Sequence, residues 1–213
     1  MVAACLLPLL RLVARALGLG GDLGADPIRT VTLTTGLWTL RFLLATLAVT
    51  PLRRLAGFAR LAPYRRTFGL LAFSYASLHF LTYAVLDLWG QWDTLLEDIA
   101  KRPWITLGFT GFVLLVPLAV TSTRASIRRL GKRWVQLHRL VYAAAVAGCI
   151  HFLWLVKKDV REPLIYAAIL AALFAARGIV LLRKASEGPP RDIVPRSDVG
   201  ERARKRTGAR SEP

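Results

Sequence analysis

The stretch WITLGFTGFVLLVPLAVTS, residues 104–122, decides the fold class because it runs for 19 residues without a charged side chain. A helix of about 20 apolar residues is long enough to cross the hydrocarbon core of a bilayer. A second run, LVYAAAVAGCIHFLWLV (140–156), is also free of charge. Neither run alternates polar and apolar residues as a membrane β-strand does. We therefore expect an all-α integral membrane protein.

The chain is predicted to cross the membrane six times. The six spans are residues 3–20, 31–50, 66–86, 103–121, 134–156 and 163–183. The first is the weakest, because Pro8, Arg11 and Arg15 interrupt it. We therefore expect the chain to divide into two parts. Residues 1–183 form the helix bundle, and residues 184–213 form a basic cytoplasmic tail. The tail is rich in charge, Pro, Gly and Ser, a composition typical of disorder.

Basic residues explain the net charge of +17 without a nucleic-acid partner, because they cluster between the spans. Segments 51–66 and 121–134 each hold five Lys or Arg and no acid, whereas the segments 21–30 and 87–102 are acidic. Loops retained in the cytoplasm are rich in Lys and Arg. The alternation therefore predicts that both termini are cytoplasmic. We expect the chain to contact membrane lipid and not to bind nucleic acid.

Only three histidines occur, and all three lie in predicted spans. An ionisable side chain inside a membrane points to function, because its burial costs free energy. His79 lies eight residues before Asp87, and His151 eight residues before Asp159, on two spans that run in the same direction. Each histidine is therefore about 12 Å from the outer boundary. Two imidazoles at one level suit the axial positions of a b-type haem iron, and we predict His79 and His151 as this pair.

His138 is the less certain histidine. It lies thirteen residues before His151, about 20 Å along a helix axis and on another face. Gly148 lies between them and permits a local bend. We expect His138 either to serve a second cofactor near the cytoplasmic face, such as a quinone, a flavin or a second haem, or to point elsewhere.

Among the arginines within predicted spans, Arg41 and Arg177 carry separate expectations. Arg41 is at mid-span in LWTLRFLLATL, where a guanidinium needs an anion or must extend to an interface. A haem propionate would be a suitable anion, so Arg41 is a candidate cofactor-binding residue. Arg177 lies near the end of the last span and is expected to extend to the interface.

Several motifs of this chain resemble the MsrQ family of haem-binding membrane subunits. They are GADP (24–27), RFLLATLAVTPLRR (41–54), SLHFLTYAVLDL (77–88), KRPWITLG (101–108), TSTRA (121–125), and GKRWVQLHRLVY with IHFLW within 131–154. The resemblance covers roughly residues 20–185. More distantly, the arrangement is similar to the ferric reductase-like transmembrane domain.

This resemblance implies a bacterial inner-membrane protein that binds b-type haem and FMN. It implies electron transfer from the quinone pool to a periplasmic molybdopterin enzyme of the MsrP type, which repairs oxidised methionine in envelope proteins. The catalytic reductase is then expected on the partner chain. The three motif histidines of the family match His79, His138 and His151.

Other functions remain open at this point. Each histidine alone can be a neutral imidazole bonded to a neighbouring helix. Together they can form a proton relay in a small transporter, and the chain can be a haem-free anchor that docks a partner. Zinc is disfavoured, because a structural zinc takes four ligands and neither acids nor thiols accompany the pair.

Overall fold

The computed structural model describes residues 2–19, 21–156 and 159–186 of the 213-residue chain. The residues that it describes form helices, turns and loops but no strand, which confirms the all-α prediction. The elements are α1 (Val2–Ala16), α2 (Pro27–Leu55), η1 (Ala59–Leu61), α3 (Tyr64–Leu81), η2 (Thr82–Asp87), α4 (Trp92–Lys101), α5 (Pro103–Val120), α6 (Arg124–Leu130), α7 (Lys132–Leu137), α8 (Leu140–Leu155) and α9 (Arg161–Ser186).

Within the described ranges, five helical segments are long and apolar enough to cross a membrane. They are Pro27–Leu55, Ala59–Asp87, Pro103–Val120, Lys132–Leu155 and Arg161–Arg183. These segments match the second to sixth predicted spans, and the chain is a multi-pass membrane protein. The helix α1 has 15 residues and is not in this set. It still packs against the bundle, because Leu12 is buried and the Tyr75 hydroxyl donates to the Cys5 carbonyl at 3.0 Å.

Local sequence sets where the long helices begin. The Asp26 side chain caps α2 by accepting a hydrogen bond from the Arg29 amide at 3.0 Å, and Pro27 occupies the first turn. Pro103 opens α5 in the same way. Between α6 and α7, Gly131 adopts a φ of 49°, a backbone conformation that disfavours side chains with a Cβ. The basic segment therefore folds back as two short helices before α8 begins.

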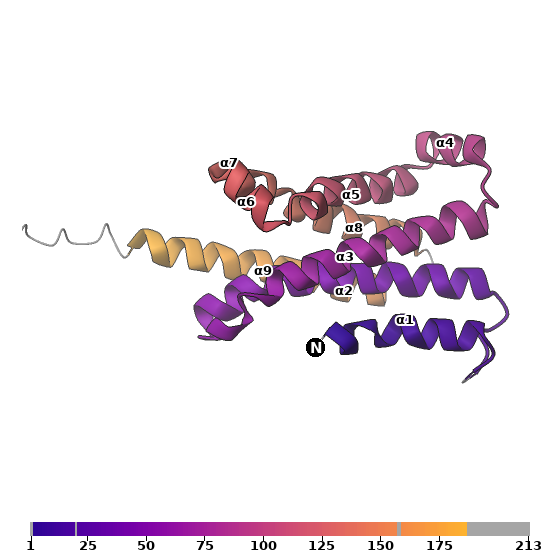
Figure 1. Ribbon diagram of the computed structural model, residues 1–213, viewed down its shortest axis with the longest axis horizontal. Coiled ribbons are helices and arrows are strands. Elements are labelled where there is room, and N and C mark those ends of the chain that lie inside the picture. The colour runs from indigo at the N-terminus through magenta and orange to yellow at the C-terminus, as the bar shows by residue number, and fades with distance from the viewer. Residues whose placement is uncertain (1, 20, 157–158, 187–213) are drawn as a thin grey trace, which may run out of the picture. The chain divides into compact units, whose positions relative to one another are not determined.

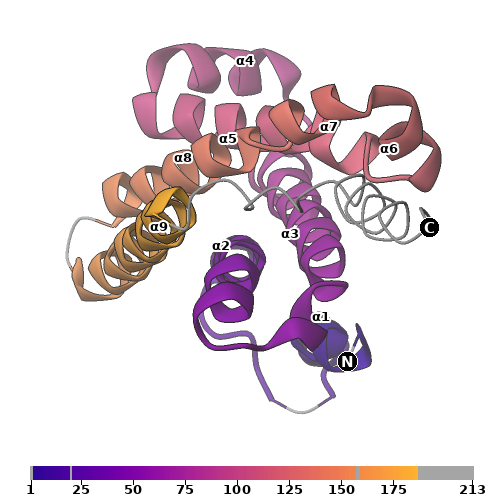
Figure 2. The ribbon, with the colours of Figure 1, turned by 90° about the vertical axis from the view of Figure 1, so that its left-hand side faces the viewer.

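Two helical hairpins build the bundle (Figures 1 and 2). One is α2 packed on α3, and the other is α5 packed on α8. Small residues let α5 and α8 approach closely: a Cβ at Gly111 would lie 3.5 Å from the Ala147 Cβ. The helix α9 joins through side chains, with Phe174 packed edge-on against Tyr142 of α8 at 6.0 Å.

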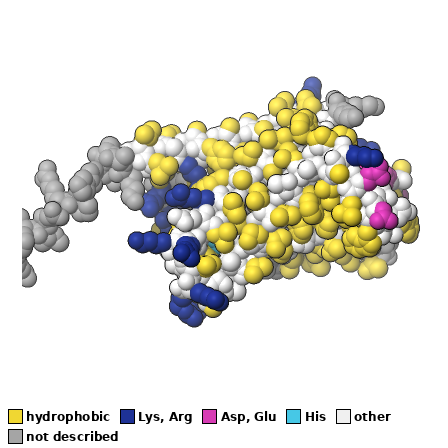
Figure 3. All heavy atoms as spheres, turned by 90° about the horizontal axis from the view of Figure 1, so that it is seen from above, with side chains coloured by type: hydrophobic (Ala, Val, Ile, Leu, Met, Phe, Trp, Pro, Cys, Tyr) yellow, Lys and Arg dark blue, Asp and Glu magenta, His cyan; other side chains and the backbone are white. Residues whose placement is uncertain are grey.

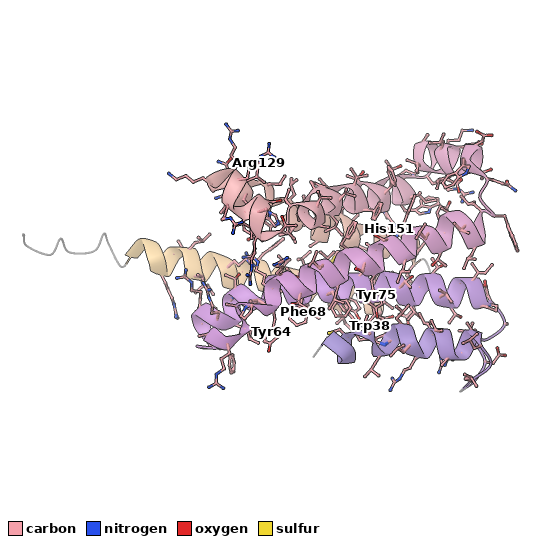
Figure 4. The ribbon with its side chains drawn as sticks, viewed as in Figure 1. Trp38, Tyr64, Phe68, Tyr75, Arg129 and His151 are labelled. Atoms are coloured by element: carbon pink, nitrogen blue, oxygen red, sulfur yellow. The ribbon has the colours of Figure 1, made fainter. Side chains whose placement is uncertain are left out.

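Aromatic side chains fill the α2–α3 hairpin. Trp38, Tyr75, Phe68 and Tyr64 follow its length (Figure 4). Phe42 joins them, with ring centroids 5.3 Å from Tyr75 and 6.4 Å from Phe68. Tyr75 is only 1% exposed. Such contacts stabilise the hairpin beyond simple apolar burial.

Charges separate to opposite ends of the bundle. In Figure 3, Lys and Arg side chains gather at one end, Asp and Glu lie at the other, and apolar surface lies between them. We call the first the basic end and the second the acidic end. The acidic end includes α4, a helix in a segment that the sequence predicted as a loop.

Chain contacts divide the protein into Met1–Val180 and Leu181–Pro213. The bundle described above belongs to the first unit, and of the second unit only residues 181–186 are described. The predicted domain boundary at 183/184 stays a prediction, since the tail from 187 onward lies outside the described residues.

Candidate functional site

The two histidines predicted as a pair lie together in the structure. His79 projects from α3 and His151 from α8, with ring centroids 6.2 Å apart and ring planes at 76°. Both side chains are largely withdrawn from solvent. Since each ring comes from a different hairpin, the pair lies where the two hairpins meet.

Backbone carbonyls orient both rings. The His79 Nδ1 donates to the Thr32 carbonyl at 2.9 Å, and the His151 Nδ1 donates to the Trp104 carbonyl at 2.6 Å. A carbonyl on one ring nitrogen fixes the tautomer and directs the other nitrogen to a metal. In both residues that nitrogen is Nε2.

The distance between the rings suits one metal ion between them. Imidazole–metal bonds of about 2 Å on either side require ring centroids roughly 6 Å apart. The surroundings are apolar: Phe80, next to His79, stacks on Phe112 at 5.2 Å and contacts Phe109 at 5.8 Å. The two imidazoles are therefore spaced so that they would hold one metal ion between them, beside a cluster of aromatic side chains.

Two glycines at this site were not foreseen from the sequence. A Cβ at Gly36 would lie 3.0 Å from the His79 ring, and one at Gly108 would lie 2.8 Å from the His151 ring. The signal that finds them is an internal repeat: Trp104, Gly108 and His151 each lie 72 positions after Thr32, Gly36 and His79. The two hairpins therefore supply equivalent residues.

His138 lies at a break between helices rather than within one. The helix α7 ends at Leu137, His138 caps it, and α8 begins at Leu140. The sequence permitted a bend at Gly148, but α8 continues through that glycine and the helix is interrupted at His138. The His138 ring stacks on Trp134 with centroids 3.8 Å apart, and its Nδ1 donates to the Trp134 carbonyl at 3.1 Å.

A cavity of about 220 Å³ adjoins His138 at the basic end. Its lining residues come from both hairpins and from the basic segments: Leu43, Thr46, Ala62, Arg65, Arg66, Gly69, Leu115, Leu118, Ala119, Ser122, Ile127, Trp134, His138 and Val141. Several of them again pair across 72 positions, and in that register Arg66 is the counterpart of His138. The second predicted site is therefore unsymmetrical, with one histidine and two arginines.

Two buried side-chain nitrogens lack a hydrogen-bond partner among the described residues: His138 Nε2 and Arg177 Nε. The expectation that Arg177 extends to the interface is wrong. Its guanidinium turns inward, donating to the Leu47 carbonyl at 3.0 Å and to the Tyr142 hydroxyl. Unpartnered buried polar atoms are costly. Arg177 Nε is a donor, whereas His138 Nε2 is an acceptor or a metal ligand in the neutral ring, because its Nδ1 carries the proton.

Arg41 does not turn toward an interface. Its Nε donates to the Tyr166 hydroxyl at 2.8 Å, and its guanidinium lies 4.8 Å from the Trp38 ring centroid. The side chain is exposed on the bundle surface. Tyr166 in turn packs on Phe152, the residue after His151. The haem-propionate role stays a prediction.

Comparisons with known proteins identify the family of this chain. Residues 32–149 match the family described as ferric reductase like transmembrane component. A protein of Xanthomonas campestris pv. campestris, a "protein-methionine-sulfoxide reductase heme-binding subunit MsrQ", is 54% identical over 74% of this chain and 73% of its own length. The protein of the same description from Rhodospirillum rubrum is 52% identical over 87% and 88%. No solved structure matches the chain.

Proposed function

We infer the function from the family, since this chain belongs to the MsrQ proteins and carries a ferric reductase-like transmembrane domain. It acts as the membrane electron-transfer subunit of a methionine sulfoxide reductase system. Its relatives carry the words heme-binding subunit in their names. The reductase chemistry belongs to a partner chain.

One observation carries the proposal: the facing imidazoles of His79 and His151, with both Nδ1 atoms bonded to carbonyls. We assign these residues as the axial ligands of a b-type haem. Such a haem supplies reversible one-electron chemistry. The chain would contribute ligation by His79 and His151 and the carbonyl contacts that orient their rings.

A visible spectrum of the purified protein tests this proposal. We expect a low-spin b-type spectrum that dithionite reduces, with at least one haem per chain. His79→Ala should abolish that low-spin signal, whereas Ser77→Ala, whose hydroxyl bonds to the Phe73 carbonyl of its own helix, should retain it. A colourless protein would favour the proton relay or the haem-free anchor, and an unchanged spectrum in His79→Ala would refute the ligand assignment.

The distribution of charge supports an orientation of the chain in the membrane, and the family supports a route for the electrons. We assign the basic end to the cytoplasm, with both termini there, because cytoplasmic loops of inner-membrane proteins are rich in Lys and Arg. The pair of His79 and His151 then lies toward the periplasm, near a partner of the MsrP type. Electrons come from the quinone pool. Re-oxidation of the reduced haem by the purified periplasmic partner tests this route, and absence of re-oxidation would contradict it.

A second cofactor is supported by the cavity beside His138. Arg65 and Arg66 line it, and His138 Nε2 has no partner among the described residues. An anionic group fits the two guanidinium groups, and FMN, with its phosphate, is our candidate. The neutral His138 ring, with its proton on Nδ1, offers Nε2 to a donor of the same cofactor. We expect substoichiometric or full FMN in the purified wild-type protein, and at least about tenfold weaker retention in Arg66→Gln. Equal FMN retention in this variant and in the wild type would remove Arg66 from the site.

A further inference from the structure

The glycines beside the paired histidines lie in helices, where glycine is normally unfavourable. Gly36 lies in α2 and Gly108 in α5. An alanine at either position would favour the helix by limiting backbone freedom. Glycine therefore stabilises the helix less than alanine would at both positions, unless a neighbouring group leaves no room for a Cβ atom.

The histidine rings leave little room for a Cβ atom at either glycine. The three atoms nearest to a Cβ at Gly36 all belong to the His79 ring, and those nearest to a Cβ at Gly108 all belong to the His151 ring. No backbone atom of a neighbouring helix is among them. The glycines thus make room for imidazole rings and not for a helix crossing.

Each ring is held between two features of the same opposing helix. One turn before each glycine, the carbonyl of Thr32 or Trp104 accepts the hydrogen bond from Nδ1. The carbonyl fixes where the ring edge lies, and the glycine lets the ring lie close against the helix. Together the carbonyl and the glycine determine the orientation of each imidazole plane.

We propose that Gly36 and Gly108 are positioning residues which, with the carbonyls of Thr32 and Trp104, hold the two imidazole planes nearly perpendicular. The planes stand at 76° in the structure. The inference rests on the proposed function, because it concerns the ligands of the haem. The relative orientation of axial imidazoles governs the electron distribution of ferric haem iron, so this device sets its magnetic signature and reduction potential.

The two positions are not equally tight. At Gly108 the nearest ring atom, Nδ1, would be 2.8 Å from a Cβ, and at Gly36 the nearest ring atoms would be 3.0 Å away. The hydrogen bond is also shorter at His151. Adding a methyl group at Gly108 should therefore disturb ring orientation more than adding one at Gly36.

Electron paramagnetic resonance of the ferric wild-type protein tests the orientation without any substitution. Perpendicular imidazoles give one strongly anisotropic line at large g, and parallel imidazoles give a rhombic three-line signal. We expect the large-g line. A rhombic signal from a haem that still loses its low-spin spectrum in His79→Ala would overturn this inference alone. A protein without haem would overturn the proposed function as well.

Gly108→Ala and Gly36→Ala test the device itself. We expect both to alter the large-g line and to shift the midpoint potential, with the larger change in Gly108→Ala. Gly111→Ala is the matched control on the same helix, because its Cβ would meet Ala147 at an ordinary 3.5 Å, and Gly178→Ala meets nothing within 4 Å. Both controls should keep the wild-type signal and potential. Unchanged signals in Gly36→Ala and Gly108→Ala would overturn the positioning role.

Discussion

The two ends of the bundle use the same pair of hairpins in different ways. Toward the acidic end, the hairpins supply matched residues, and the Nδ1 of each histidine has a carbonyl partner. At the basic end, the counterpart of His138 is Arg66, and His138 Nε2 has no partner among the described residues. At the acidic end the two hairpins place matched imidazoles, which is the basis of the proposed metal site. At the basic end the lining combines one histidine with Arg65 and Arg66, so the two sites differ in charge and symmetry.

The strongest test of this contrast removes one histidine from each end. We expect His151→Ala to lower the haem content, or to convert the haem to a five-coordinate form that binds carbon monoxide, reducing the low-spin signal by more than about tenfold. His138→Ala should leave the low-spin signal of the pair. Absorption spectra of the two variants, with and without carbon monoxide, measure this. Equal loss in both variants would erase the distinction between the ends.

Asp98 tests how tightly the acidic end is held. This carboxylate is 5% exposed, accepts a hydrogen bond from the Tyr83 hydroxyl and pairs with Arg102 at 3.0 Å. It therefore ties the end of the His79 helix to α4. Asp98→Ala leaves the Tyr83 hydroxyl without its acceptor and should destabilise the protein by about 1–3 kcal/mol. Thermal unfolding in detergent measures the change, and a wild-type midpoint would contradict it.

Tyr142 tests the basic end. Tyr142→Phe removes the hydroxyl that accepts from Arg177, whose Nε already lacks a partner. We expect a loss of about 1 kcal/mol in the free energy of unfolding. Tyr64→Phe, in which the ring keeps its packing on Phe68, serves as the control. A loss in the control as large as that in Tyr142→Phe would contradict a specific role for the contact between the Tyr142 hydroxyl and Arg177.

The smallest effect is expected at a surface ion pair on the same helix as Asp98. Glu97 and Lys101 lie 2.6 Å apart, but their side chains are 58% and 73% exposed. Glu97→Gln should change stability by less than about 0.5 kcal/mol, because solvent screens exposed pairs. The same thermal unfolding assay applies. A loss as large as that of Asp98→Ala would mean that burial does not separate the two carboxylates.

The spans and the paired histidines were predictable because they depend on the length of apolar runs and on the number of residues between positions. Apolar length defines a membrane helix, and equal distances from His79 to Asp87 and from His151 to Asp159 put both rings at one level. The structure brings those rings together. Their role as ligands was a prediction from the sequence and stays one.

Other features depend on contacts that counting does not reach. The helix α4 was missed because its charges indicated a loop, although Trp92, Leu95, Leu96 and Ile99 follow helical spacing. Arg177 was expected at the interface because its position in the span is near the end. Its inward turn depends on the Leu47 carbonyl and the Tyr142 hydroxyl, which come from other helices.

The 72-residue repeat also has a meaning for descent. Two hairpins that each contribute one histidine, one glycine and one carbonyl to a shared centre correspond to the halves of a symmetric dimer joined into a single chain. Neither hairpin completes the centre alone. A substitution at the histidine or the glycine of one hairpin therefore affects the centre that both hairpins share. Elsewhere the two halves need not match, and at Arg66 and His138 they carry different residues.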